Sequence, residues 1–279
     1  MTDEYKSLGS RYAVLGLPII RGVVNFGESL YIGLKTLSYS SSFYEEEDYE
    51  PGKVEQFFTK IFGDKLESVL MGITMVISVI LALGIFMVLP FFLTNLMKGF
   101  LPSYSIRTLI EGIIRVALFL IYIWLISKME DIKRVFMYHG AEHKTINCLE
   151  AGVPLTPENV DNFSRLHKRC GTSFIFIVMI ISMVFFFFIR VDTIWLRIVL
   201  RLLFLPLVAG VSYEFIRLAG SSDHPLVQIF SKPGLALQKL TTKEPDHSMI
   251  EVAIASVEGV FDWREYLDSL NKGEQKEDE

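Results

Sequence analysis

The chain has 279 residues, of which 51% are hydrophobic, and its mean hydropathy of +0.39 excludes an ordinary soluble domain. A formal net charge of −5, without a basic run or an aromatic RNA-binding motif, also excludes a nucleic-acid-binding protein. The charged residues gather in a few segments between long apolar runs, a pattern typical of a multi-pass protein embedded in a lipid bilayer.

The first predicted element is an amphipathic helix at residues 12–37, within the polar N-terminal region 1–65. Four polar residues share one stripe of this helix: Arg21, Asn25, Glu28 and Lys35. The helix is too polar to span a bilayer alone, so two placements remain open, in the interface or re-entering from the cytoplasmic side. No secretory signal opens the chain, so internal segments are expected to drive membrane insertion.

Four later stretches are long and apolar enough to cross the hydrocarbon core, which takes about 20 helical residues. These stretches are residues 66–93, 106–126, 171–189 and 195–219. The predicted fold is therefore an all-α membrane protein with four transmembrane helices in two hairpins, at residues 66–127 and 171–219.

Lysines and arginines orient this arrangement. The short loops after the first and third stretches carry two basic residues each, whereas the central loop, residues 128–170, carries seven. Because cytoplasmic loops are enriched in basic residues, the central loop is expected to be cytoplasmic. The N-terminal region and the C-terminal region, residues 220–279, are then cytoplasmic too, and the central loop forms a cytoplasmic helical domain.

Residues 138–152, YHGAEHKTINCLEAG, hold the strongest chemical signal in the chain, on a predicted helix that ends at Gly152. A spacing of four places His139 and His143 one turn apart on one face, where two imidazoles can bind one metal ion. Glu142 lies beside them and can accept a proton from metal-bound water. The pattern H-x-x-E-H is the inverted zincin signature.

The cofactor implied by these residues is a divalent transition metal. Zinc is the first choice, although histidine and carboxylate ligands also suit iron and manganese. Gly140, inside the same helix, costs about 1 kcal/mol relative to alanine and often marks a close approach by another group. The alternative explanation is that the histidines make polar contacts with lipid head groups, with His167 in a basic collar that faces the lipid.

A zinc centre of this type needs a third protein ligand and an open position for water. Glu214 is the first choice, because it lies 71 residues after His143, in the range where inverted zincins supply a glutamate. His167 is the second choice, and Cys170 follows it three residues later. Two further residues, both also consistent with a turn, lie beyond the last apolar stretch: Asp223 and His224.

Several of these candidates have a structural alternative. Glu214 can pair with Arg217 or Arg201 near the membrane interface. Cys170 can be a small buried residue. Cys148 and Cys170 are too few for a disulfide framework, and both are expected to be free thiols on the reducing side of the membrane.

The second apolar stretch contains an ionisable pair, Glu111 and Arg115, at positions i and i+4. Ionisable residues within a span are functional candidates, so a proton or ion route is one interpretation. A buried structural ion pair is the other.

Several blocks of the sequence resemble the YqhQ-like family of bacterial membrane proteins. They are LGLPIIRGVVNFGESLYIGLKTL, YHGAEHKTINCLEAG, LHKRCGTSF, GVSYEFIRLAG and LQKLTTKEPDHSMIEVAIASVEGV, and the resemblance covers roughly residues 10 to 262. It implies a multi-pass protein of the bacterial cell membrane and a predicted metal-dependent enzyme. By position, this label attaches to His139, Glu142 and His143, with His167, Cys170 and Glu214 in matching blocks. His247 departs from the acidic or polar residues of relatives, which argues against it as a ligand.

Two functional hypotheses follow. In the first, a zinc ion held by His139, His143 and Glu214 activates water for a hydrolase at the cytoplasmic face, with Glu142 as the base. In the second, the same cluster is a polar hub, and the protein is a scaffold or assembly factor for other membrane proteins. The first predicts that Glu142→Gln abolishes activity without loss of metal, and the second that this change is tolerated.

Overall fold

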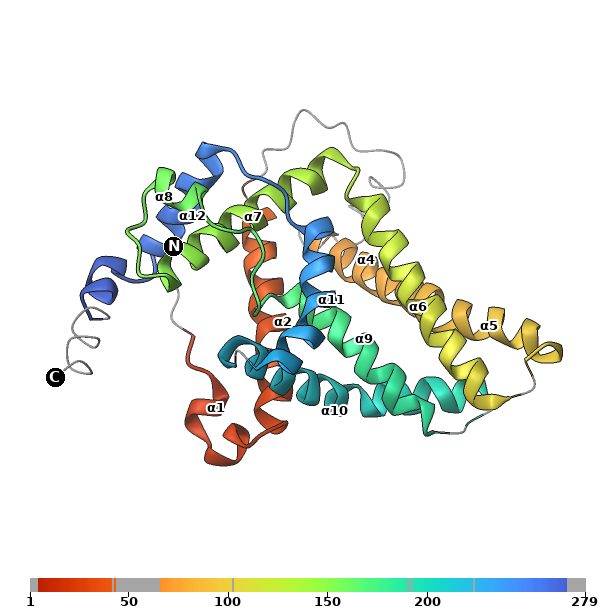
Figure 1. The fold of residues 1–279 in the computed structure, drawn as a ribbon. Helices are drawn as coiled ribbons and strands as arrows, with labels where there is room; N and C mark the ends of the chain where they lie inside the picture. The colour runs from red at the N-terminus through yellow and green to blue at the C-terminus, as the bar shows by residue number, and fades with distance from the viewer. Residues whose placement is uncertain are drawn as a thin grey trace.

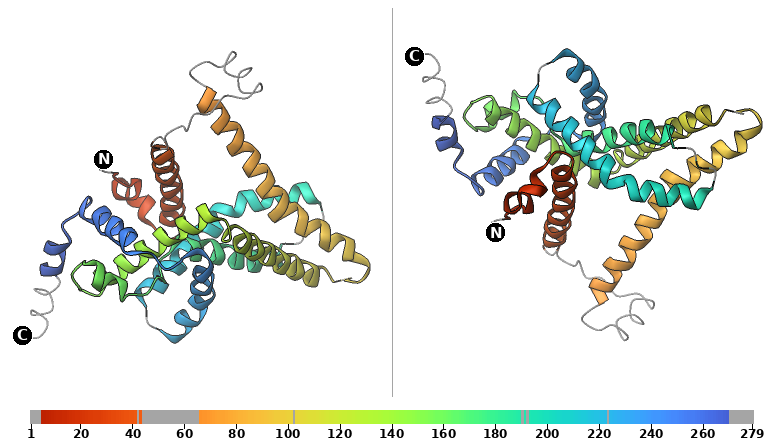
Figure 2. Two further views of the ribbon diagram at one scale, coloured as in Figure 1. Left: turned by 90° about the horizontal axis from the view of Figure 1, so that it is seen from above. Right: turned by 90° about the horizontal axis from the view of Figure 1, so that it is seen from below.

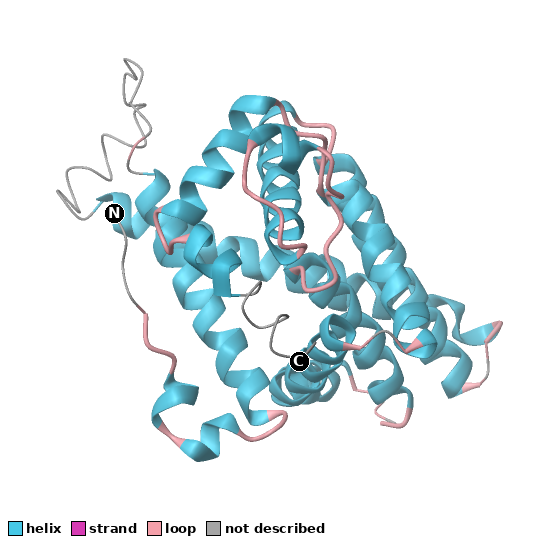
Figure 3. Cartoon of the chain, turned by 60° about the vertical axis from the view of Figure 1, so that its left-hand side comes forward, coloured by secondary structure: helices cyan, strands magenta, loops and turns pink. Residues whose placement is uncertain are grey.

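A computed structural model of the protein describes residues 5–41, 43, 66–101, 103–189, 191, 193–222 and 224–269. Within these ranges every regular element is a helix or a helical turn, and none is a strand (Figure 3). The prediction of an all-α protein is therefore confirmed for the described part of the chain. Asp223, one of the predicted ligands, lies outside the described residues.

Two short helical elements, α1 (Leu8–Arg11) and the 3-10 turn η1 (Ala13–Gly16), precede the long N-terminal helix α2 (Ile20–Ser41). The start predicted at residue 12 is therefore wrong, because Pro18 has no N–H to donate in a helix interior and Ile19 adopts a φ of 69°. Glu28 on α2 holds the N-terminal elements, since its carboxylate accepts a hydrogen bond from the Ser7 hydroxyl at 2.8 Å.

Helix α2 crosses α10 (Ile194–Ser221) where both helices carry a glycine. A Cβ at Gly22 would lie 2.9 Å from the Gly210 Cα, and a Cβ at Gly210 would lie 2.5 Å from the Ile19 carbonyl oxygen. Small residues allow such close approach of helix backbones. Beside the crossing, Arg21 forms an ion pair with Glu214, so part of the predicted polar stripe holds α2 on α10.

Two helical hairpins form the body of the molecule (Figure 1). The first contains α4 (Leu66–Leu83), the π-helical turn η3 (Gly84–Val88), α5 (Leu89–Leu96), the 3-10 turn η4 (Met97–Gly99) and α6 (Tyr104–Ile126). The second contains α9 (Gly171–Phe187) and α10, with α11 (Pro225–Thr241) packed on α9. The two hairpin turns meet, because the Tyr104 hydroxyl donates to the Ile189 carbonyl at 2.9 Å and accepts from the Val191 N–H at 2.8 Å.

Within the described ranges, three helices are long and apolar enough to cross a membrane. These are Val69–Gly99, Tyr104–Ile126 and Trp195–Ser221, while α9 is an apolar helix of 17 residues. Their exposed surfaces are rich in leucine, isoleucine and valine, as expected for contact with lipid. Helix α4 diverges from α6 away from the α5–α6 turn, so the first hairpin is open like a V (Figure 2).

The π-helical turn η3 lies just before Pro90. Proline has no N–H to donate to the carbonyl four residues earlier, which belongs to Phe86. The Phe86 carbonyl instead accepts a hydrogen bond from Arg115 Nε of α6 at 2.8 Å. An arginine side chain therefore supplies a donor at the position where the proline interrupts the helix.

Outside the hairpins, α7 (Glu130–Glu150), α8 (Pro157–Asp161) and α12 (His247–Glu258) pack together, and we call them the α7–α8–α12 unit (Figure 1). Its core contains Ala141, Cys148, Leu155, Val160, Met249, Ile250, Ile254, Trp263 and Leu267. Gly152 ends α7 as predicted, with a φ of 71°. Thr156 caps α8, and Asp246 caps α12 by accepting from the Met249 N–H at 2.9 Å.

Candidate functional site

Three of the predicted ligands converge where the α7–α8–α12 unit meets the second hairpin. One ligand atom from each of His139, His143 and Cys170 lies within 4.8 Å of the other two. The two imidazole rings stand 4.3 Å apart between centroids, and the Cys170 Sγ lies 3.3 Å from His139 Nε2. The i, i+4 spacing on α7 aligns the histidines, and the cysteine comes from the residue that begins α9.

Both imidazoles are oriented by backbone carbonyls. His139 Nδ1 lies 2.8 Å from the Thr241 carbonyl oxygen, and His143 Nδ1 lies 2.7 Å from the Arg165 carbonyl oxygen. A carbonyl oxygen only accepts, so each Nδ1 carries the proton and donates it. In the neutral rings each Nε2 then keeps a free lone pair, which is the arrangement that prepares histidine for a metal.

The Cys170 thiol is strongly activated. Burial raises its pKa, but hydrogen bonds with His139 and His143, and with Thr172 at the start of α9, outweigh burial and lower the pKa to about 5. Burial lowers the pKa of His139, yet its bond with Cys170 and its bond to the Thr241 carbonyl raise the pKa above the ordinary value. The lowered pKa of Cys170 and the raised pKa of His139 describe a thiolate that accepts from a protonated Nε2 of His139. A metal ion would take the place of that proton and bind the thiolate and the imidazole nitrogen.

A backbone crossing explains the glycine inside α7. The segment between α11 and α12 passes directly over Gly140, where a Cβ would lie 2.1 Å from the Lys243 carbonyl oxygen. The same segment is fastened to α7, since the Lys243 N–H donates to the Phe136 carbonyl at 2.8 Å. This crossing places the Thr241 carbonyl on His139, so the close approach predicted at Gly140 is confirmed and is part of the site.

The loop that carries the other carbonyl is held by Asn147 of α7, which donates to the Ser164 and Leu166 carbonyls, and by a buried glutamine. Gln238 on α11 is fully buried, accepts from the His167 N–H at 2.8 Å and donates to the His167 carbonyl at 2.7 Å. Its amide also donates to Ser173 Oγ at 2.7 Å. These bonds fix residues 162–170, and with them both Arg165 and Cys170.

The remaining predicted residues lie apart from this cluster. Glu214 is held on α2 by Arg21 and by the Ile19 N–H at 3.2 Å. The His167 ring lies 5.8 Å from that of His143, but its Nε2 is directed to Glu150 at 3.3 Å.

Glu142 is exposed and lines a groove between α7 and α12, although its charge contributes to raising the pKa of His139. His224 caps α11 by accepting from the Leu226 N–H at 3.3 Å, and His247 is an exposed residue in the first turn of α12.

The buried carboxylate in the first hairpin has more partners than the sequence suggested. Glu111 pairs with Arg115 as expected, and also with Arg197 and Arg201 of α10. The i, i+4 spacing of these two arginines within an apolar helix indicates a shared buried acidic partner, whereas the sequence led us to expect Arg201 only as a partner for Glu214.

The fold and the cluster together define a helical protein with membrane-length apolar helices and a His–His–Cys group at the base of one hairpin. A family model described as "Protein of unknown function (DUF1385)" matches residues 17–263, and the chain belongs to this family. The chain is similar to a protein of Bacillus subtilis (strain 168) named "Uncharacterized protein YqhQ". The two are 37% identical over 261 residues, which cover 93% of this chain and 80% of the relative. The resemblance to the YqhQ-like family is thus confirmed. No solved structure matches the chain.

Proposed function

We propose that this protein is a metal-dependent membrane enzyme, of hydrolase type, whose metal is held by His139, His143 and Cys170. The observation that carries the proposal is the convergence of three ligand atoms, two of them on imidazoles whose Nδ1 protons are already donated to carbonyls. A purely structural polar contact does not require both Nε2 lone pairs and a thiolate to face one point.

The geometry and donor chemistry fit zinc. Tetrahedral zinc, with bonds of about 2.0–2.3 Å, places its nitrogen and sulfur ligands roughly 3.3–3.6 Å apart. His139 Nε2 and Cys170 Sγ are 3.3 Å apart, and the largest separation among the three atoms is 4.8 Å, so a small closure completes the site. Two imidazoles and a thiolate favour zinc over the hard cations magnesium and calcium. Three protein ligands leave a fourth position for water, as in catalytic zinc sites.

A metal bound here would lower the pKa of its water to about 7 and so supply hydroxide at neutral pH. Thr241 and Arg165 orient the two imidazoles through their carbonyls. Glu142 is the proposed proton acceptor, because it directly precedes His143 and its charge acts on His139, although its side chain lines the groove between α7 and α12. The substrate would be a peptide or a lipid head group that reaches the membrane surface.

We further propose that four helices cross the bacterial cell membrane, with α9 as the fourth. A length of 17 residues is at the lower limit for a span, and α9 packs between α6, α10 and α11. The distribution of lysine and arginine then places the α7–α8–α12 unit and both termini in the cytoplasm. Helix α2, packed on α10 through Gly22, would enter the membrane from that side rather than lie flat on it.

Elemental analysis of the full chain, solubilised in a mild detergent without chelators, tests the metal centre. We expect about one zinc per wild-type chain and none in the His139→Ala, His143→Ala double variant. His247→Ala is the matched control, since this exposed histidine lies outside the cluster. Wild-type protein without transition metal, even after reconstitution with zinc, would refute the proposal and favour the scaffold hypothesis.

Cobalt substitution tests whether the fourth position is open. We expect a thiolate-to-cobalt charge-transfer band that Cys170→Ser abolishes and that Cys148→Ser, a change at the other buried cysteine, preserves. Added azide should shift the visible cobalt spectrum if water occupies the fourth position. A spectrum insensitive to azide would indicate a closed, structural metal and would contradict the catalytic part of the proposal.

A further inference from the structure

A second charged cluster lies within the hairpins, away from the histidines. The Glu111 carboxylate, 1% exposed, accepts from Arg115 at 3.0 Å and from Arg197 and Arg201 at 2.5 Å each. Glu111 and Arg115 lie seven and eleven residues into α6, about 10 and 16 Å along its axis. The cluster is therefore below the end of the bundle and within its apolar part.

The charges of this cluster do not balance. Three guanidinium groups surround one carboxylate, which leaves a net charge of +2 among the described residues. Uncompensated charge in an apolar bundle is costly, so ionisable groups at such depth are normally paired. Moreover, Arg201 Nε is buried and has no hydrogen-bond partner among the described residues. An anionic hydrogen-bond acceptor would offset part of this positive charge and would accept from Arg201 Nε.

A cavity opens beside the unpaired donor. It has a volume of about 350 Å³, within the range of about 300–1,000 Å³ typical of ligand sites. Arg115 and Arg201 line one part of it, and the rest of its lining is almost entirely apolar, from η3, α4, α9 and α10. One side of the cavity is lined by α4, the helix that diverges from α6 in Figure 2. A basic wall and an apolar wall suit an amphiphile with an anionic head.

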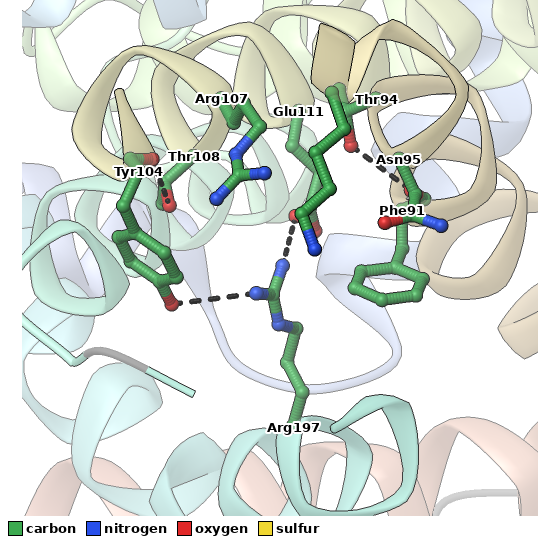
Figure 4. A pocket seen from close by; sticks show the side chains of 9 residues that line it. Phe91, Thr94, Asn95, Tyr104, Arg107, Thr108, Glu111 and Arg197 are labelled. Atoms are coloured by element: carbon green, nitrogen blue, oxygen red, sulfur yellow. Dashed lines mark hydrogen bonds and ion pairs between the residues drawn. The ribbon is translucent and has the colours of Figure 1, made fainter. Parts of the chain in front are cut away.

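A neighbouring pocket adds to the positive potential. Its lining includes Lys98, Arg107 and Arg197, with Glu111 as its only acidic residue. Figure 4 shows the Arg107 and Arg197 side chains directed toward the same space from α6 and α10. This pocket lies toward the hairpin turns, so basic groups extend from the end of the bundle down to Arg201.

We propose that the cavity between α4, α9 and α10 binds an anionic phospholipid of the bilayer. Its phosphate accepts hydrogen bonds from Arg115 and Arg201, including the unpaired Nε, and its single negative charge reduces the net charge of the Glu111 cluster from +2 to +1. Its acyl chain lies along the apolar wall of the cavity. The inference is independent of the metal centre, because the two clusters share no residue.

Native mass spectrometry of the detergent-solubilised full chain with added lipid tests this proposal. The probes are phosphatidylglycerol and phosphatidylcholine with identical chains, together with palmitate and inorganic phosphate. We expect one phosphatidylglycerol to bind at least about tenfold more tightly than phosphatidylcholine, since charge-assisted hydrogen bonds distinguish an anionic head from a zwitterionic one.

Three variants locate the lipid. Ala82→Phe fills the cavity from α4 without altering a charge, and we expect it to remove the preference for phosphatidylglycerol. Ala117→Phe makes the same change at an exposed position of α6 outside the cavity, and should retain the preference. Arg201→Gln should also weaken phosphatidylglycerol binding about tenfold. Because Arg201→Gln also disturbs Glu111, Ala82→Phe is the decisive variant.

Three results would overturn the proposal. Equal binding of both phospholipids to every variant would mean surface lipid only. Palmitate binding in preference to phosphatidylglycerol would assign the site to a carboxylate. Inorganic phosphate bound as tightly as the lipid would show that the apolar cavity contributes nothing.

Discussion

Gly140 is the residue at which the packing of α7 and the candidate metal site can be tested together. The change is Gly140→Ala, which adds a single methyl group where the segment between α11 and α12 crosses the helix. That methyl would lie 2.1 Å from the Lys243 carbonyl oxygen, whereas an ordinary contact is at least 3.4 Å. The crossing segment or α7 must therefore move by about 1.3 Å.

The free-energy terms have opposite signs. Alanine is better than glycine in a helix interior by about 1 kcal/mol. Overpacking costs about 1–3 kcal/mol, and the hydrogen bond from the Lys243 N–H to the Phe136 carbonyl, if lost, costs about 1 kcal/mol more. We expect a net destabilisation of about 1–3 kcal/mol for unfolding of the α7–α8–α12 unit. The displaced Thr241 carbonyl would also leave His139 without its orienting acceptor, which typically weakens metal binding 10–100-fold.

Two assays separate these effects. Thermal unfolding, followed by circular dichroism, reports the stability, and competition with a chromogenic chelator reports zinc affinity. Gly33→Ala is the matched control, because Gly33 lies inside α2 and a Cβ there meets nothing within 4 Å. A Gly140→Ala protein with wild-type stability and zinc affinity would refute the argument that this crossing orients the site.

Further predictions concern thiol reactivity, helix packing and pH. Iodoacetamide should modify Cys170 faster than Cys148, because burial raises the pKa of the Cys148 thiol to about 11, and bound zinc should protect Cys170. Peptide mass spectrometry measures the modification of each cysteine, and equal modification of both would contradict the proposed site. Gly22→Leu should separate α2 from α10, because the α10 backbone lies 2.9 Å from the new Cβ. We expect faster proteolysis within α2, and an unchanged rate of proteolysis would count against this packing. The pKa of Asp246 is lowered by a hydrogen bond from Ser248, so its contribution to stability is complete above the ordinary carboxyl pKa and is lost as pH falls through the lowered value. Asp246→Asn should therefore flatten the acid limb of a stability-against-pH curve, and an unaltered limb would argue against this cap.

Features that depend on a few neighbouring residues were predicted well from the sequence. Gly152 acts within one helical turn, so the predicted end of α7 follows from residue type, and the caps at Thr156 and Asp246 depend on equally local contacts. The alignment of His139 and His143 likewise follows from helical periodicity. In contrast, the start of α2 depends only partly on the local sequence, through Pro18, and otherwise on a distant contact of Ile19. Ile19 has a positive φ there, and its N–H donates to Glu214, 195 residues away in the chain.

The third ligand of the candidate metal site could not be chosen correctly from the sequence, because its position also depends on contacts between distant parts of the chain. Spacing along the chain favoured Glu214, whereas the structure brings Cys170 to the histidines and leaves Glu214 on Arg21. The path of residues 162–170 decides this outcome, and that path is held by a glutamine on α11 and an asparagine on α7, neither of which belongs to a metal-binding motif. The orienting carbonyls are also invisible to pattern reading, because every residue has one.

The position of the site explains how one metal could couple the two parts of the molecule. His139 and His143 belong to α7, which follows α6 after a short turn, whereas Cys170 is the N-cap of α9 and Thr241 is the last residue of α11. A metal bound to both imidazoles and the thiolate would therefore fix the α7–α8–α12 unit against the base of the second hairpin. Without it, the thiolate and the imidazoles hold the same junction only through hydrogen bonds. Metal loading should thus alter the mobility of this unit relative to the membrane helices, and not only the chemistry at the fourth position.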